Sequence, residues 1–134
     1  MSYDLFVGCF VDGEKARFPR ERLESYFGPY ITRREQNCST LDFGAHGTSY
    51  LYCADQIQID GFSINRPVGA PELFQALFDA LRAGPLVLFA PGDCPPLIGD
   101  AQHSVHVPAA MVAALGTPVV LRSAAEILQR IATA

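Results

Sequence analysis

The strongest constraint on the fold is the apolar run YDLFVGCFV, which occupies residues 3–11. Apolar side chains fill both of its parities, since Leu5 and Val7 alternate with Phe6 and Phe10. A strand with one solvated face would alternate apolar and polar residues, whereas a strand covered on both faces is apolar throughout. The run therefore predicts a strand at the centre of a sheet, buried on both sides.

Further along the chain the hydrophobic period changes. Residues 38–66 alternate with period two and predict a meander of three antiparallel strands. The alternation slips at Asp60-Gly61, where a glycine bulge would absorb the change of parity. The clearest helix is expected over residues 71–83, because Leu73, Leu77 and Leu81 form one stripe. Shorter segments predict strands at 86–90 and 117–121 and a helix within 108–116.

Two more helices are predicted from their start signals. One covers residues 19–27, because Pro19 suits a first helical position and Gly28 a C-terminal cap. The other covers 123–132, with Ser123 and Glu126 spaced as a capping box. The pattern as a whole predicts an α+β fold, a single domain over residues 1–134. Its mixed, mainly antiparallel sheet would be covered by three to four helices.

Composition excludes several classes of function. Hydrophobic residues make up 49% of the chain and charged residues 18%, which is typical of a folded domain rather than a disordered one. A net charge of −4, without a basic stripe, argues against nucleic-acid binding. No apolar run is long enough for a membrane span and no signal peptide is visible, so we expect a cytoplasmic protein. Six basic side chains are interleaved with acids and predict a solvated face: Lys15, Arg17, Arg20, Arg22, Arg33 and Arg34.

The four cysteines are too far apart for a C-x-x-C motif, so neither a zinc site nor a thioredoxin-like pair is predicted. We expect four free thiols, because cytosolic cysteines stay reduced. Cys9 and Cys53 lie in apolar runs and are interpreted as small core residues. Phosphate-loop, dinucleotide-binding and H-E-x-x-H motifs are absent, and no cofactor or metal is expected. The cysteines are Cys9, Cys38, Cys53 and Cys94.

One proline-rich segment, residues 90–108, holds the residue types of a catalytic site, namely Cys94, His103 and His106. A catalytic cysteine needs a stabilised thiolate. Pro95 and Pro96 leave no helix N-terminus to provide it. In an extended segment, His103 and His106 would point to opposite faces and could not bind one metal. A small enzyme using Cys94 with His103 or His106 remains the alternative to a proline-pinned loop.

The order of segments resembles the small cytoplasmic immunity proteins of bacterial polymorphic-toxin and interbacterial secretion systems. The resemblance lies in YDLFVGCF, FPRERLESYFG, a tyrosine-bearing hairpin, LVLFAPGDCPP with VHVP, and PVVLRSAAEILQRI. It covers most of the chain as a pattern, without a diagnostic residue. It implies a protein that neutralises a cognate toxin by binding it and carries no catalytic residues.

If this resemblance holds, the hairpin from Asp42 to Tyr52 is the expected partner-binding surface. Asp42, His46, Tyr50 and Tyr52 alternate there with core residues, and acidic and tyrosyl groups suit a basic enzyme cleft. The same hairpin is equally typical of an ordinary half-exposed sheet edge. A structural or regulatory domain without a toxin partner is a third interpretation.

Overall fold

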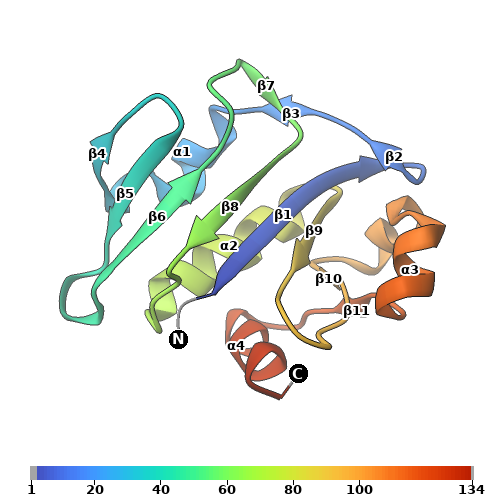
Figure 1. Ribbon diagram of the computed structural model, residues 1–134. Coiled ribbons are helices and arrows are strands. Elements are labelled where there is room, and N and C mark those ends of the chain that lie inside the picture. The colour runs from blue at the N-terminus through green and yellow to red at the C-terminus, as the bar shows by residue number, and fades with distance from the viewer. Residues whose placement is uncertain (1–2, 134) are drawn as a thin grey trace.

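The N-terminal strand β1 (Asp4–Val11) lies at the centre of a mixed, mainly antiparallel sheet, between β8 (Gly61–Asn65) and β9 (Leu86–Phe89) (Figure 1). The computed structural model describes residues 3–133. The order of strands is β11-β10-β9-β1-β8-β6-β5-β4, with β10 and β11 parallel and the other neighbours antiparallel. The predicted α+β class is confirmed. The other strands of this order are β4 (Ile31–Arg34), β5 (Cys38–Asp42), β6 (Thr48–Tyr52), β10 (Leu97–Ile98) and β11 (Val119–Val120). The short strand β2 (Glu14–Lys15) pairs with β1.

One face of this sheet is covered by three helices, α1 (Arg22–Phe27), α2 (Pro71–Ala83) and α4 (Ala124–Thr133). Helix α2 contacts both α1 and α4 and has the bounds that its leucine stripe predicts. These helices and the inward parity of the strands form the main core. Its fully buried large side chains include Leu5, Phe27, Leu41, Ile64, Leu73, Leu77, Leu81, Leu88, Leu97 and Ile127.

The opposite face is covered at one end only. Helix α3 (Ala109–Leu115) packs Met111 and Val112 against a second cluster formed by Phe10, Val87, Ile98 and Val107. Figure 1 shows α3 at the β9–β10 end, away from β5 and β6. Because this helix is too short to reach the first half of β1, the prediction that the whole run is buried on both faces is wrong. Phe6 is 53% exposed.

The first helix begins later than Pro19. Residues Phe18–Pro19 form a short strand, β3, which pairs with β7 (Gln58–Ile59) in a separate two-stranded sheet. Phe18 is buried in the main core, so the chain stays extended until its ring is in place. Helix α1 then starts at Arg22, and the predicted start at Pro19 is wrong.

The parity slip at Asp60-Gly61 divides the third predicted meander strand into β7 and β8. Strand β8 stays in the main sheet, where β5, β6 and β8 form the expected meander, while β7 leaves it to pair with β3. Gly61 faces Gly8 on β1, and a Cβ atom at Gly61 would overlap the carbonyl oxygen of Val7. Glycine is needed there because the two backbones approach so closely.

The C-terminal helix is close to its predicted bounds, although its start differs in detail. The carboxylate of Glu126 accepts a hydrogen bond of 2.8 Å from the backbone N–H of Arg122, not from Ser123 as a capping box requires. The segment predicted as a strand over 117–121 is reduced to the two residues of β11. Three short 3-10 helices complete the described chain: η1 (Gly28–Tyr30), η2 (Gly44–His46) and η3 (Ala101–His106).

Candidate functional site

The uncovered part of the sheet carries a continuous row of side chains across four strands. Cross-strand register places Phe89 beside Phe6, Phe6 beside Ser63, and Ser63 beside Tyr52. Phe6 is 53% exposed and Tyr52 is 42% exposed. Neighbouring strands are about 4.8 Å apart, so these two rings stand about 10 Å from each other with the small Ser63 between them. We call this set the aromatic row.

A second row runs parallel to the aromatic row and is polar. It joins Asp4 to Asn65, Asn65 to Tyr50, and Tyr50 to Thr40 on strand β5. The residues of this row have the same parity as Phe6 and Tyr52, so they lie on the uncovered face. Together the two rows present large aromatic groups beside carboxylate, amide and hydroxyl groups.

Three of the four residues predicted as partner-binding share this face, and the fourth lies at its edge. Tyr50 and Tyr52 project from β6. Asp42 lies at the end of the preceding strand β5, opposite Thr48, and has the same parity. Asp42 also shapes the turn, since its carboxylate accepts a 2.9 Å hydrogen bond from the N–H of Gly44. His46 lies in η2 and is exposed. Sequence reasoning missed that Phe6 and Phe89, distant in the chain, extend the surface.

Tyr52 interacts with its cross-strand neighbour Cys38. The pKa of Tyr52 is raised, mainly by a hydrogen bond with that thiol and to a smaller degree by the negative charge of the Cys38 thiolate form. The phenol is therefore neutral near pH 7 and can both donate and accept a hydrogen bond. Such a group provides an apolar ring with a polar tip, which is the usual form of an interface anchor.

The proline-rich loop has a different geometry from a nucleophilic site. Cys94 is 4% exposed and packs in the main core, and its thiol donates to the adjacent Pro95 carbonyl at 3.4 Å. Burial raises the pKa of the Cys94 thiol, which Arg130 only partly offsets. Among residues 3–133, no hydrogen bond joins this thiol to a histidine. Burial and a raised pKa both oppose thiolate formation.

His103 and His106 lie in the 3-10 helix η3 and not in an extended segment. The prediction that they point to opposite faces assumed an extended chain, so its premise is wrong. His106 holds the β1–β2 hairpin: its Nδ1 accepts a 3.0 Å hydrogen bond from the N–H of Asp12, and its carbonyl accepts one of 3.1 Å from Gly13. Within residues 3–133, Nδ1 of His103 is buried without a hydrogen-bond partner. Within the described residues, no group of three or more His, Cys, Asp or Glu side chains is arranged to hold a metal ion.

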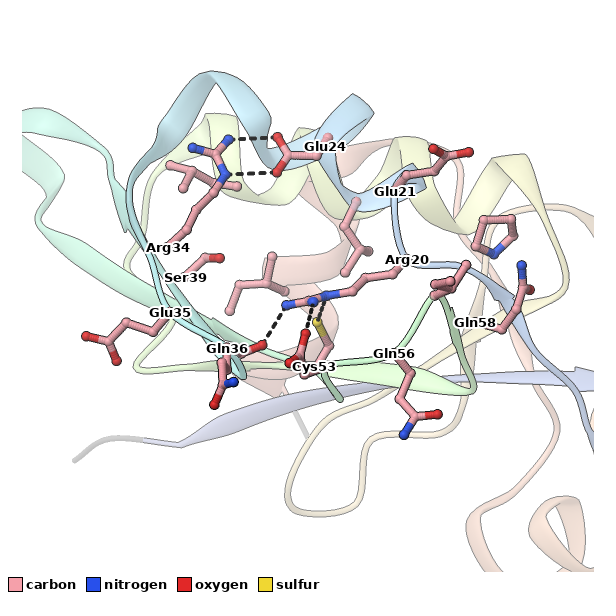
Figure 2. A pocket seen from close by; sticks show the side chains of 16 residues that line it. Arg20, Glu21, Glu24, Arg34, Glu35, Gln36, Ser39, Cys53, Gln56 and Gln58 are labelled. Carbon is pink, nitrogen blue, oxygen red and sulfur yellow. Dashed lines mark hydrogen bonds and ion pairs between the residues drawn. The ribbon is translucent and has the colours of Figure 1, made fainter.

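A cavity of about 660 Å³ lies on the helical side of the sheet, between α1 and the ends of β4, β5 and β6 (Figure 2). Leu23, Ile31 and Leu51 provide its apolar lining. Arg20 and Arg34 also line it, as does the hydroxyl of Ser39. The sequence predicts a solvated face for both arginines, and no local signal places them in a cavity.

Arg20 is fixed at the cavity by three hydrogen bonds. Nε donates to Sγ of Cys53 at 3.2 Å, Nη1 to Oδ1 of Asp55 at 3.0 Å, and Nη2 to the carbonyl of Gln36 at 2.8 Å. Desolvation acts to lower the pKa of Arg20, but Cys53 and Asp55 raise it overall. Cys53 packs against the main core, in line with its apolar run, but it is only half-buried and also lines the cavity.

Arg34 and Glu24 form a two-bonded ion pair between β4 and α1. Nε and Nη2 of Arg34 donate to the two carboxylate oxygens of Glu24 at 3.0 and 2.8 Å. This hydrogen bonding lowers the pKa of Glu24. Both side chains are more than half exposed, so the pair can exchange with water or with another anion at small cost.

Comparison of the chain with protein-family models, curated proteins and solved structures gives no match. None of the helices within residues 3–133 is long and apolar enough to cross a membrane. All four cysteines are free thiols.

Proposed function

We propose that this protein acts by binding another protein through the uncovered face of its sheet, and that the partner is a cognate bacterial toxin which it neutralises by contact. The aromatic row is the observation that carries the binding proposal. The toxin as partner follows from the resemblance to immunity proteins, and a cytoplasmic location belongs to the same proposal. No catalytic residue is required, because occlusion of a toxin needs only a stable scaffold and a complementary surface.

The aromatic row supports this proposal by its energetics. A phenylalanine side chain buries about 200 Å² when it is fully covered, so the 53% of Phe6 that is exposed corresponds to about 100 Å². Covering that area would contribute about 2.5 kcal/mol of binding free energy before the costs of association. Tyr52 would add a similar amount and one hydrogen-bonding group.

The charges beside the row favour a basic partner. Asp4 and Asp42 stand on the uncovered face, and the whole chain carries a formal charge of −4. Two basic groups near the ends of the uncovered face form ion pairs, Lys15 with Asp60 at 3.7 Å and Arg33 with Glu35 at 3.0 Å. Complementary charge would speed the encounter, and the aromatic groups would slow dissociation.

The test is co-expression with the product of the neighbouring gene, followed by a measurement of cell survival and of complex formation on the purified proteins. The double variant Phe6→Ala with Tyr52→Ala should weaken binding at least about a hundredfold, because two exposed anchors are removed. Tyr50→Ala with Tyr52→Ala should weaken protection as well. Leu128→Ala is the control, since Leu128 is 42% exposed on α4, away from the row.

The same experiment separates binding from catalysis. Cys94→Ala and His103→Ala should leave protection intact. If either change alone abolishes it in a stably folded protein, the enzyme alternative is favoured and the binding proposal is wrong. If both aromatic double variants protect as well as the unchanged protein, the uncovered face is not the interface.

A further inference from the structure

The cavity beside α1 has the features of a small-molecule site and is independent of the aromatic row. Its volume of about 660 Å³ falls within the range of ligand pockets, and apolar side chains line it together with a few polar groups. It opens on the helical side of the sheet, whereas the aromatic row lies on the other side. A ligand could therefore occupy it whether or not a protein partner is bound.

Two guanidinium groups border the cavity and keep hydrogen-bond donors that the described residues do not use. A guanidinium has five N–H donors, and Arg20 uses three of them and Arg34 two within residues 3–133. Both arginines therefore keep unused donors. The hydroxyl of Ser39 lies on the same wall, and register places Ser39 directly beside Arg34.

Four carboxylates also border the cavity, so its lining carries more acidic than basic groups. Asp55 and Glu24 each accept from one of the two arginines. Glu21 and Glu35 also border the cavity, but in Figure 2 their carboxylates point away from the space between Arg20 and Arg34. Their charge nevertheless disfavours a ligand that carries two or more negative charges.

From this geometry we infer that the cavity binds a small monocarboxylate with an apolar body. The carboxylate would accept hydrogen bonds from Arg20, Arg34 and Ser39, and would share Arg34 with Glu24. The apolar body would contact the accessible apolar lining, which is formed by Pro19, Ile31 and Ile57. Arginine suits this role because its planar fork matches the two oxygens of a carboxylate.

The probe is hexanoate, followed by the movement of backbone amide signals in two-dimensional NMR spectra of the whole chain. A ligand of this size in a suitable pocket is expected to bind with a Kd on the order of 1 mM. Shifts should be confined to residues around the cavity. Hexylamine, which has a similar chain but the opposite charge, should cause none of them.

Two adjacent arginines provide a matched pair of variants. Arg34→Gln should weaken hexanoate binding at least about tenfold, because a charged hydrogen-bond donor is lost. Arg33→Gln makes the same change of charge one residue away, beside Thr40 on the uncovered face. It also removes the ion pair of Glu35 at the border of the cavity, so it should weaken binding, but clearly less than Arg34→Gln does. Ser39→Val fills space beside Arg34 and should also reduce binding. Signal dispersion reports whether each variant is folded.

Three results would overturn the inference. The first is the absence of signal shifts at hexanoate concentrations well above the expected Kd, and the second is equal shifts with hexanoate and hexylamine. The third is an equal loss of hexanoate affinity in Arg33→Gln and Arg34→Gln. The last would indicate a general charge effect rather than a site. None of them bears on the toxin-binding proposal, which is tested on different residues.

Discussion

Gly99 offers a direct test of how closely the segment after β10 packs against helix α2. A Cβ atom added at Gly99 would lie 2.5 Å from the backbone nitrogen of Arg82 and 2.5 Å from the carbonyl carbon of Leu81. It would also lie 2.6 Å from the Leu81 carbonyl oxygen. These neighbours are backbone atoms in the last turn of α2, so they cannot rotate away as a side chain can. Relief of the contact requires one segment to move by about 1 Å.

We expect Gly99→Ala to lower the free energy of unfolding by about 2–3 kcal/mol, the upper part of the range for overpacking, because the obstacle is backbone. With a urea m-value of about 1.5 kcal/mol/M, the midpoint should fall by about 1.3–2 M. The assay is urea unfolding followed by circular dichroism and by fluorescence of the tyrosines.

The matched control is Gly69→Ala, the same chemical change at a position where an added Cβ meets nothing within 4 Å. This variant should be neutral, or more stable by a few tenths of a kcal/mol, because alanine reduces the entropy of the unfolded chain. If Gly99→Ala and Gly69→Ala unfold at the same urea concentration, the close approach of Gly99 to α2 is refuted.

Two further predictions concern titratable groups. Cys9 and Cys94 should react slowly with a thiol reagent in the native protein, since burial raises the pKa of both thiols. All four cysteines should react after unfolding. Rapid labelling of Cys94 in the native protein would contradict its buried position. The lowered pKa of Glu24 implies stability that is present above the unfolded pKa of about 4.3 and is lost as the pH falls through the folded value. The pair of Glu24 and Arg34 therefore contributes a small part of the difference in urea midpoint between pH 7 and pH 3. Arg34→Gln should make this difference smaller. An unchanged difference would show that the pair contributes nothing to stability.

Local signals predicted those parts of the fold whose partners are close in sequence. The α2 helix follows from its leucine stripe and its Gly84-Pro85 end, because helical periodicity depends on residues three and four apart. The meander of β5, β6 and β8 follows from period-two alternation in the same way. The predicted start of helix α1 is wrong because burial of Phe18 and pairing of β3 with β7, a long-range contact, override the local preference of Pro19.

The candidate sites were only partly predictable, for the same reason. Tyr50 and Tyr52 could be assigned to the outward face of the sheet because they alternate with core residues in one hairpin. Phe6 could not, since its exposure depends on how far the distant helix α3 reaches across the sheet. Two cysteines differ from what their local sequence predicts. Cys94, followed by two prolines in a predicted loop, is buried, while Cys53, in an apolar run, is only half-buried and lines a cavity beside Arg20.

The sequence by itself determined the class of fold, the central place of the first strand and the main helix, because hydrophobic period and turn residues act within a few positions. Tertiary structure decided which face of the sheet is left open and where the arginine cavity forms. Burial of a side chain is set by whatever segment covers it, and that segment can lie anywhere in the chain. An apolar run therefore shows that a strand can be buried on both faces, and only packing shows whether it is.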